Sequence, residues 1–343
     1  MKQHPIFIFA RTPLHIGAGS SVGAIDLPVQ RERHTGFPII PASSLKGSFA
    51  DQWPTPLRNE KDEIVRVVEK NKAQDPTVSE EITILTKKVE QDSKKENIEY
   101  LAHQSAWLFG SDNTDLAFAG SLIFSEARVL AFPIRSARGS YAWITCPLML
   151  QRAARDGVFT GTALAEINKL KEPPDTATQG FAIFKPDPLG LGAEKKQIVL
   201  EEYCFDHFQG ASDEIAKALA ALVSDTLFAT ITGRLVILSN GMMSHFVTTC
   251  CEVAQHVRIS DETGTAEEGG LFNQENVPAD TLFYSVLSAT NSRVPGENFK
   301  DDPKTKPGTK ALATFKAKVD TVKVFQFGGD ATTGLGFCTV AAV

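Results

Sequence analysis

The most informative part of this sequence reads Leu14-His-Ile-Gly-Ala-Gly-Ser-Ser-Val-Gly-Ala-Ile-Asp26-Leu-Pro-Val-Gln-Arg-Glu-Arg-His34, and then Gly36-Phe-Pro-Ile-Ile-Pro-Ala-Ser-Ser-Leu-Lys46-Gly47. The apolar residues 5–12 predict a strand that leads into this glycine-rich loop. A helix is expected to begin near Ser43. Flexible backbone, one carboxylate, basic neighbours and a helix N-terminus are together typical of a site for a phosphate-bearing ligand.

Bulk properties narrow the class of protein. The chain has 343 residues, a formal net charge of −6 and 42% hydrophobic residues, so it can form a sizeable core. We expect one elaborated domain over residues 1–343, although the length would also allow two. No apolar run approaches a membrane span and no signal peptide is evident, so we expect a cytoplasmic protein with no membrane partner. The negative net charge argues against a protein that binds nucleic acid through its overall charge, but it is compatible with a local basic groove.

Two further segments stand out by composition. After the helix that begins near Ser43, residues 58–99 are dense in Lys and Glu, with apolar residues interspersed. This pattern predicts a helical insertion with a solvated face. Residues 172–197 are rich in proline and glycine and predict a loop or linker.

A projecting β-hairpin is expected in the second half of the chain. The polar and glycine-containing residues 261–270 separate the strand-like segments 257–259 and 271–272. Such a turn between two apolar segments is typical of a hairpin.

The C-terminal residues Gly328-Gly-Asp-Ala-Thr-Thr-Gly-Leu-Gly336 form a second glycine-rich loop, which strands are expected to flank. With little side-chain bulk, such a loop can bring backbone N–H groups close to phosphate oxygens. It is not a P-loop, because the Gly-Lys-Ser/Thr sequence is missing and a strand follows. A simple tight turn is the alternative interpretation.

Asp26 and His15 are the candidates for chemistry in the first loop. A lone loop aspartate commonly caps a turn, but Asp26 lies among glycines, His15 and basic residues. A carboxylate in that setting could bind a divalent metal ion or assist deprotonation of a ribose 2′-OH. For His15, a structural role and a general acid/base role both remain open.

Lys46 is a candidate phosphate contact, since it lies near the expected helix N-terminus beside Ser43 and Ser44. Arg31 and Arg33 are weaker phosphate-contact candidates, which could equally be solvated. Zinc-site and serine-hydrolase motifs are missing from the sequence.

These residues resemble the RAMP superfamily of CRISPR ribonucleoproteins, and within it the repeated backbone subunit of the type III-B Cmr complex. The glycine-rich C-terminal loop is one part of the resemblance. The other parts are Leu14-His-Ile-Gly-Ala-Gly19, Ala24-Ile-Asp26-Leu-Pro-Val-Gln-Arg-Glu32, Pro38-Ile-Ile-Pro-Ala-Ser-Ser-Leu-Lys-Gly47, Leu108-Phe-Gly110 and Leu271-Phe-Asn-Gln-Glu275-Asn-Val-Pro-Ala-Asp-Thr-Leu-Phe283.

The resemblance implies an α+β fold with a ferredoxin-like (RRM-type) core, the helical insertion at 58–99 and a thumb hairpin within 255–283. Copies of such a subunit stack into a filament along guide RNA, together with other subunits of the Cmr complex. The thumb of each copy displaces a nucleotide of the guide–target duplex, and complementary target RNA is cut at regular intervals.

The resemblance also implies roles for individual residues. The catalytic aspartate falls on Asp26, which would also hold a divalent metal ion, Mg²⁺ or Mn²⁺. The loop histidine falls on His15, and Glu275 is a second acidic participant. The basic residue of the helix start falls on Lys46. Together with the local chemistry above, the predicted RNA contacts are Ser43, Ser44, Lys46, Arg31, Arg33, Gly328, Gly329, Thr332, Thr333, Gly334 and Gly336.

The expected reaction is attack of the RNA 2′-OH on the adjacent phosphate, which leaves a 2′,3′-cyclic phosphate and a 5′-OH. The main alternative is a purely structural RAMP subunit that assembles on guide RNA and cuts nothing. A guide-processing endonuclease of the same superfamily is a more distant alternative, because it would need a histidine-centred site.

Overall fold

The computed structural model describes residues 3–19, 24–53, 55–58, 64–68, 104–110, 119–176, 179–210, 212–293 and 299–343. The chain divides into two compact units, each built from segments that are far apart in the sequence. The larger unit comprises His4–Pro41, Glu126–Val286 and Lys323–Val343, and the smaller comprises Met1–Gln3, Ala42–Ser125 and Leu287–Val322. The expectation of a single domain stays a prediction.

The larger unit combines a sheet with covering helices, which makes the fold a mixed α+β fold with a strand-rich core. Its strands are β1 (His4–Ala10), β2 (Ile39–Ile40), β6 (Ala127–Ser136), β7 (Ser140–Thr145), β8 (Gly180–Phe184), β9 (Gln197–Leu200), β10 (Tyr203–His207), β11 (Leu235–Ile237), β12 (Glu252–Ile259), β13 (Ala266–Asn276), β14 (Leu282–Ala289, of which Leu282–Val286 belong here), β15 (Val324–Gln326) and β16 (Phe337–Ala342). Its helices are α4 (Pro147–Arg155), α5 (Gly161–Lys169), α6 (Pro186–Leu189), α7 (Asp213–Ala220), α8 (Asn240–Thr249) and the 3₁₀ turns η2 (Phe228–Gly233) and η4 (Ala331–Thr333).

The strand order of the main sheet is β15-β16-β1-β14-β6-β7-β11-β8-β10-β9, with β2 beside β6. The predicted first strand is confirmed: β1 lies between β16 and β14, and the residues of its apolar run are buried. Such a run is expected of a central strand that is covered on both faces. At the far end, Ser136 of β6 pairs with Leu200, which brings β9 back to β6.

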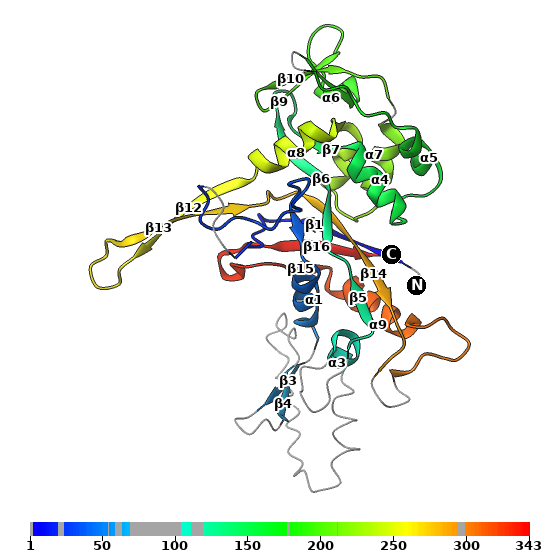
Figure 1. Ribbon diagram of the computed structural model, residues 1–343, viewed down its shortest axis with the longest axis vertical. Coiled ribbons are helices and arrows are strands. Elements are labelled where there is room, and N and C mark those ends of the chain that lie inside the picture. The colour runs from blue at the N-terminus through cyan, green and yellow to red at the C-terminus, as the bar shows by residue number, and fades with distance from the viewer. Residues whose placement is uncertain are drawn as a thin grey trace. The chain divides into compact units, whose positions relative to one another are not determined.

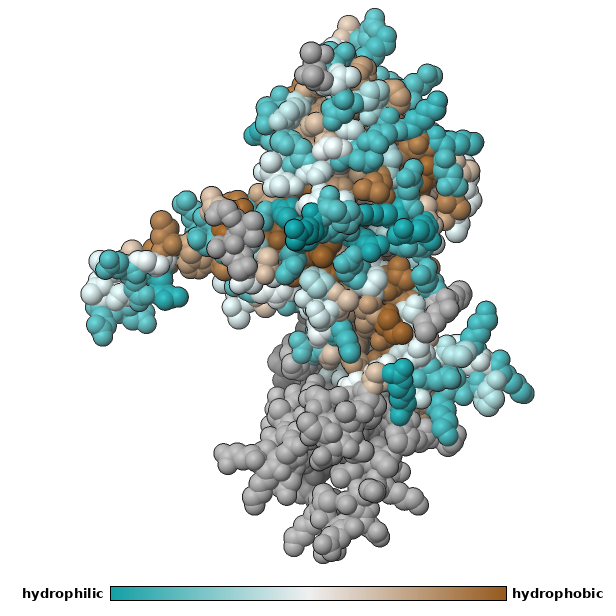
Figure 2. All heavy atoms as spheres, viewed as in Figure 1, coloured by the Kyte–Doolittle hydropathy of each residue, from teal (hydrophilic) through white to brown (hydrophobic). Residues whose placement is uncertain are grey.

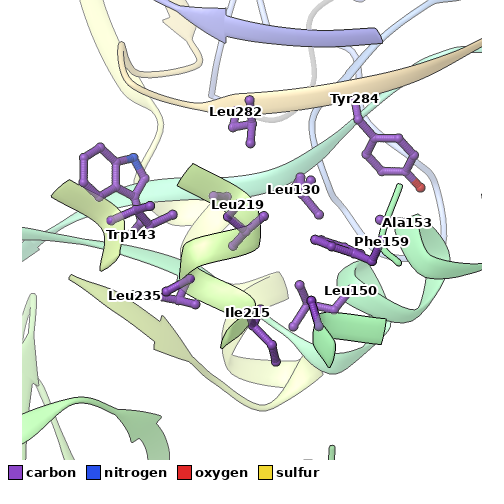
Figure 3. Packing of buried hydrophobic residues seen from close by; sticks show 14 of the residues in the cluster. Leu130, Trp143, Leu150, Ala153, Phe159, Ile215, Leu219, Leu235, Leu282 and Tyr284 are labelled. Carbon is purple, nitrogen blue, oxygen red and sulfur yellow. The ribbon is translucent and has the colours of Figure 1, made fainter. Parts of the chain in front are cut away.

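The core of the larger unit lies between the sheet and helices α4, α5 and α7 (Figure 3). Trp143 packs edge-on against Phe228 at 5.5 Å, and the ring of Phe9 lies 4.9 Å from the same phenyl ring. The indole N–H of Trp143 donates to the carbonyl of Asp280 at 2.9 Å. Burial of each such aromatic side chain contributes roughly 2–3 kcal/mol.

Strands β12 and β13 form an antiparallel hairpin that extends away from the rest of the larger unit (Figure 1). The hairpin turn is shorter than the sequence predicted, because Ile259 already pairs with Ala266 and β13 includes residues 266–270. Val257 and Leu271 face each other across the strands and are 49% and 67% exposed. Figure 2 shows a hydrophilic tip and hydrophobic side chains between the tip and the body of the unit.

The smaller unit contains α1 (Ala42–Ala50), β3 (Thr55–Arg58), β4 (Ile64–Val68), α3 (Gln104–Phe109), β5 (Leu122–Phe124), α9 (Thr309–Val322) and the last residues of β14, which pair with β5. The predicted helix is confirmed as α1, with Leu45 and Phe49 buried on one face. Phe315 of α9 packs against Phe49 at 5.0 Å and stacks on Trp53 at 5.8 Å. Aromatic packing therefore dominates this second core.

Two further predictions of secondary structure were wrong in the part of the chain that the structure describes. Within the predicted helical insertion, residues 64–68 form strand β4, which pairs with β3, because the run Ile-Val-Arg-Val-Val is rich in β-branched residues. Residues 59–63 and 69–99 lie outside the described residues. The predicted loop at 172–197 contains β8, whose apolar run is Phe-Ala-Ile-Phe. Prolines on both sides of this run led to the loop prediction.

Candidate active site at the base of the hairpin

The candidate site is organised by three consecutive residues of β13, where the hairpin joins the body of the larger unit. Asn273 holds the Asp26 loop, Gln274 holds the C-terminal glycine-rich loop, and Glu275 holds the segment that follows Asp26. Side chains alternate along a strand, so Asn273 and Glu275 lie on one face and Gln274 on the other. Segments from both ends of the chain are thereby brought to one place.

Asp26 is exposed and is fixed to Asn273 by reciprocal hydrogen bonds. The Asp26 N–H donates to Asn273 Oδ1 at 2.8 Å, and the Asn273 N–H donates to Asp26 Oδ2 at 2.9 Å. The Asn273 amide also donates to the carbonyl of Ala24 at 3.1 Å, and the Leu27 N–H donates to the carbonyl of Asn273 at 3.1 Å. Asp26 Oδ1 accepts no hydrogen bond from the residues that the structure describes, so one carboxylate oxygen is oriented and available. Residues 20–23 of the first glycine loop lie outside that range.

Glu275 is the opposite kind of carboxylate. It is 3% exposed, its Oε2 accepts from the Val29 N–H at 2.9 Å, and its Oε1 accepts from Arg31 Nη2 at 2.5 Å. Burying a carboxylate is costly unless its oxygens are paired, and both oxygens of Glu275 are.

Arg31 is a predicted RNA contact, but its guanidinium N–H groups donate to several acceptors within the protein. Besides Glu275, it donates to the carbonyls of Gly36 and Val247, each at 2.8 Å, and to Cys251 Sγ at 3.3 Å. Arg31 therefore ties the base of the hairpin to the C-terminal end of α8.

His15 contacts the backbone of Glu275 and is 8% exposed. Its Nδ1 lies 2.7 Å from the carbonyl of Glu275, and because a carbonyl can only accept, Nδ1 carries the hydrogen. Nε2 is therefore the ring nitrogen that remains for substrate. The carbonyl of His15 accepts from the Gly329 N–H at 3.0 Å, which joins the histidine to the C-terminal loop.

The C-terminal loop needs glycine at two of its predicted RNA-binding positions for a geometric reason. Gly328 and Gly336 have φ of +80° and +79°, and a Cβ there would lie 2.1 Å from the His15 carbonyl oxygen and 2.0 Å from that of Phe327. In between, Asp330 accepts from Gln274 Nε2 at 3.0 Å. The N–H groups of Ala331 and Thr332 donate to no acceptor among the described residues, so they remain available to a ligand.

The other predicted RNA contacts are distributed over both units. Gly329, Thr332, Thr333 and Gly334 are exposed in the C-terminal loop, and the Thr333 hydroxyl donates to the carbonyl of Asp330 at 2.9 Å. Arg33 is exposed on the larger unit. The remaining residues belong to α1 of the smaller unit, where Lys46 and Ser43 are exposed and Ser44 is half-buried.

The residues present fit a metal ion only in part. Among the described residues, no group of three His, Cys, Asp or Glu side chains is placed to hold one. Asp26 Oδ1 is a suitable single ligand, and Mg²⁺ is often bound by one or two carboxylates with water and substrate phosphate oxygens completing the octahedron. Asp26 therefore offers one ligand, and the described residues supply no complete metal site.

Sequence reasoning missed Asn273 and Gln274 as site residues. Both stand in the segment that carries the resemblance, directly before Glu275. Their partners Asp26 and Asp330 lie 247 and 56 residues away, so no local spacing signals the contacts.

The helices of the described residues include none that is long and apolar enough to span a membrane.

Comparison with known proteins agrees with this geometry. A model of the RAMP superfamily matches residues 8–339. The chain belongs to the RAMP superfamily. The sequence of this RAMP chain is 30% identical over 343 residues, 99% of its length and 95% of the relative, to the CRISPR system Cmr endoribonuclease Cmr4 of Pyrococcus furiosus.

Solved structures show the same fold for this RAMP chain. A crystal structure of oligomeric Cmr4 from Pyrococcus furiosus superposes with a TM-score of 0.61 at 23% identity, covering 100% of this chain and 99% of the other. A cryo-EM structure of the type III-B Cmr-beta complex bound to cognate target RNA contains a chain that superposes with a TM-score of 0.62 at 20% identity. The match covers 100% of this chain and 97% of that chain.

Proposed function

We propose that this chain is a backbone subunit of a type III-B CRISPR effector complex, which assembles in copies along guide RNA and cleaves complementary target RNA at regular intervals. The full-length similarity to a relative named as a Cmr endoribonuclease supports the family role. The observation that carries the enzymatic part is Asp26, an exposed carboxylate whose Oδ2 is fixed and whose Oδ1 is available.

In the proposed reaction, Asp26 accepts the proton of the RNA 2′-OH, and the 2′ oxygen attacks the adjacent phosphorus. The bond between phosphorus and the 5′ oxygen breaks, and this oxygen takes a proton from water, which leaves a 2′,3′-cyclic phosphate and a 5′-OH. Asp26 would be the residue that holds a divalent ion, whose chemistry would be to neutralise charge on the phosphate oxygens. The reciprocal bonds to Asn273 keep the carboxylate oriented before RNA arrives, which lowers the entropic cost of alignment.

We assign different tasks to the two other residues predicted to be catalytic. His15 presents Nε2 to the RNA strand, since its Nδ1 is committed to the Glu275 carbonyl. Glu275 is buried with both oxygens engaged, which supports a positioning role for it. The exposed N–H groups of the C-terminal loop and Lys46 would contact the phosphate backbone of RNA.

The hairpin β12–β13 would serve as the thumb of the ferredoxin-like RAMP core. Its exposed apolar pair, Val257 and Leu271, is suited to wedge against a base step, as apolar side chains do in proteins that unstack nucleic acids. Displacing a nucleotide next to Asp26 would bring the 2′-OH, phosphorus and 5′ oxygen closer to the in-line geometry that the reaction needs.

The test is cleavage of a labelled, guide-complementary RNA by the reconstituted complex, with wild type beside Asp26→Asn. Loss of a general base costs roughly 10²–10⁴-fold in rate, so we expect evenly spaced products from wild type and almost none from the variant. Asp320→Asn, an equal change at an exposed position of helix α9, is the control and should cleave normally.

Assembly on guide RNA must be measured in the same samples. Intact assembly without cleavage in wild type would favour the scaffold alternative, and normal cleavage by Asp26→Asn would refute the assignment. Repeating the wild-type assay in EDTA, with Mg²⁺ or Mn²⁺ added back, tests the proposed metal requirement.

A further inference from the structure

A cavity of about 430 Å³ in the larger unit is lined mainly by arginine side chains. The lining carries five arginines, two glutamates and His34, and Ile39 is its one apolar side chain among the residues that the structure describes. A lining of this composition favours an anionic group over an apolar one. Its arginines come from the segment after Asp26, from β6 and from α4: Arg31, Arg33, Arg128, Arg152 and Arg155.

Glu32 fixes the position of one of these arginines, Arg152. It is buried, accepts from Arg152 Nη1 at 3.1 and 2.8 Å, and accepts from the Thr35 hydroxyl at 2.6 Å, with Arg128 Nε 3.6 Å away. Burial alone would raise its pKa, but the hydrogen bonds from Thr35 and Arg152 and the nearby charges lower the pKa of Glu32 below its usual value. Glu32 therefore stays ionised and holds Arg152 in one orientation.

Arg128 is similarly held in place. It donates to Glu126 Oε1 through Nε at 3.0 Å and Nη2 at 2.9 Å, and its Nη1 lies 3.6 Å from Asp156. Asp156 in turn accepts from the Tyr284 hydroxyl at 3.0 Å. Burial alone would lower the pKa of Arg128, but contact with Glu126 raises that pKa above its usual value. The guanidinium therefore keeps its charge.

Arg31 donates to Glu275 and to protein carbonyls, whereas Arg33 and Arg155 retain donors for a ligand. Arg33 is exposed and donates to no acceptor within the described ranges. Arg155 is 69% exposed at its side chain, and its contact with Asp156 runs through Nε at 3.5 Å, which leaves both terminal nitrogens for a ligand. Guanidinium groups with unoccupied terminal nitrogens bind phosphate oxygens in a bidentate manner.

We propose that this cavity binds a phosphate group of the RNA strand, with Arg33 and Arg155 as the contacting residues and Arg128 and Arg152 as the fixed charges behind them. The inference rests on the proposed function, because it takes RNA as the ligand. The contact between Arg31 and Glu275 favours RNA over an acidic protein segment. Arg31 lines the cavity and pairs with Glu275, and the other oxygen of Glu275 accepts from the Val29 N–H in the segment that follows Asp26. The cavity is thereby connected by side-chain contacts to the segment that carries the proposed catalytic residue.

The test compares Arg33→Gln/Arg155→Gln with wild type and with the control Lys169→Gln/Lys217→Gln. Each control lysine pairs with a glutamate one turn away on its own helix, and the net-charge change is the same. Binding of a fluorescent single-stranded RNA to the full-length chain is measured over a series of KCl concentrations. We expect the arginine variant to reduce the slope of log K against log[KCl] by about 0.7–1.4, for one or two phosphate contacts, and the control to leave it unchanged.

Each outcome decides the proposal. A slope equal to wild type in the arginine variant, with RNA still bound, overturns the cavity site and leaves Asp26-dependent cleavage standing. Normal RNA binding with weakened self-association overturns it too, in favour of an acidic surface of a second copy. Failure of wild type to bind or cleave RNA would refute the proposed function itself. Thermal melts of all three proteins check that the fold is intact, as the exposure of both arginines leads us to expect.

Discussion

The base and the tip of the β12–β13 hairpin have opposite surroundings, although they are parts of the same two strands. At the base, Asn273, Gln274 and Glu275 each hold another segment of the chain by side-chain hydrogen bonds. Toward the tip, Val257 and Leu271 pair across the strands and are largely exposed. The base thus contributes to the stability of the larger unit, whereas the tip contributes little to it.

The difference separates two kinds of residue that sequence alone cannot tell apart. Asp26 and Glu275 are both carboxylates, and each stands in a segment that resembles the RAMP family. Asp26 is nevertheless exposed and has an available oxygen, whereas Glu275 is buried and both of its oxygens accept hydrogen bonds. An exposed, oriented carboxylate can do chemistry on a ligand. A buried, saturated one can fix the position of its neighbours.

The largest effect on stability is expected from Glu275→Ala at the base. The change leaves the buried Val29 N–H without its acceptor and removes the charge that pairs with Arg31. Loss of these interactions should cost about 3 kcal/mol, measured by urea unfolding of the full-length chain. Cleavage should also fall, because the segment after Asp26 loses its anchor.

Glu275→Gln separates positioning from chemistry. It keeps the shape of the side chain and one acceptor, so a positioning role predicts an intermediate loss of both stability and cleavage. If Glu275→Gln were as stable as wild type but inactive, Glu275 would have a direct part in the reaction, as the family resemblance implies.

A second change at the base, at Asn273, should affect catalysis more than stability. Asn273→Ala removes the bonds to the Asp26 N–H and the Ala24 carbonyl and should lower the cleavage rate roughly 10–100-fold, with RNA affinity kept. Gln255→Ala, which removes an amide from the residue directly opposite in β12, is the matched control and should retain the wild-type rate.

Asn273→Asp adds a pH signature to the same position. A second carboxylate beside Asp26 makes ionisation of the pair less favourable, so the acid limb of the cleavage profile should move to higher pH by about one unit. Asn273→Ala carries no charge and should leave that limb in place. An unchanged profile in Asn273→Asp would argue against Asp26 as the base.

The sequence predicts well those features that local pattern controls. The strand before the glycine loop, the amphipathic face of α1 and the presence of a hairpin follow from apolar spacing and turn residues. The contacts of Arg31 do not follow from any local pattern. Its partners Val247 and Glu275 lie 216 and 244 residues away, so an exposed arginine and a half-buried arginine that holds other segments together have the same sequence signature.

The smallest effect on stability is expected toward the tip, from Leu271→Asn. The side chain is already 67% exposed, so replacing it should change the free energy of unfolding by no more than about 0.5 kcal/mol. Cleavage of duplexed target should nevertheless fall several-fold, because an amide is a poorer wedge between bases than an isobutyl group. Leu271→Met, which keeps the apolar surface, should restore cleavage. A loss of stability in Leu271→Asn comparable to that of Glu275→Ala would mean that the tip, like the base, is part of the packed unit.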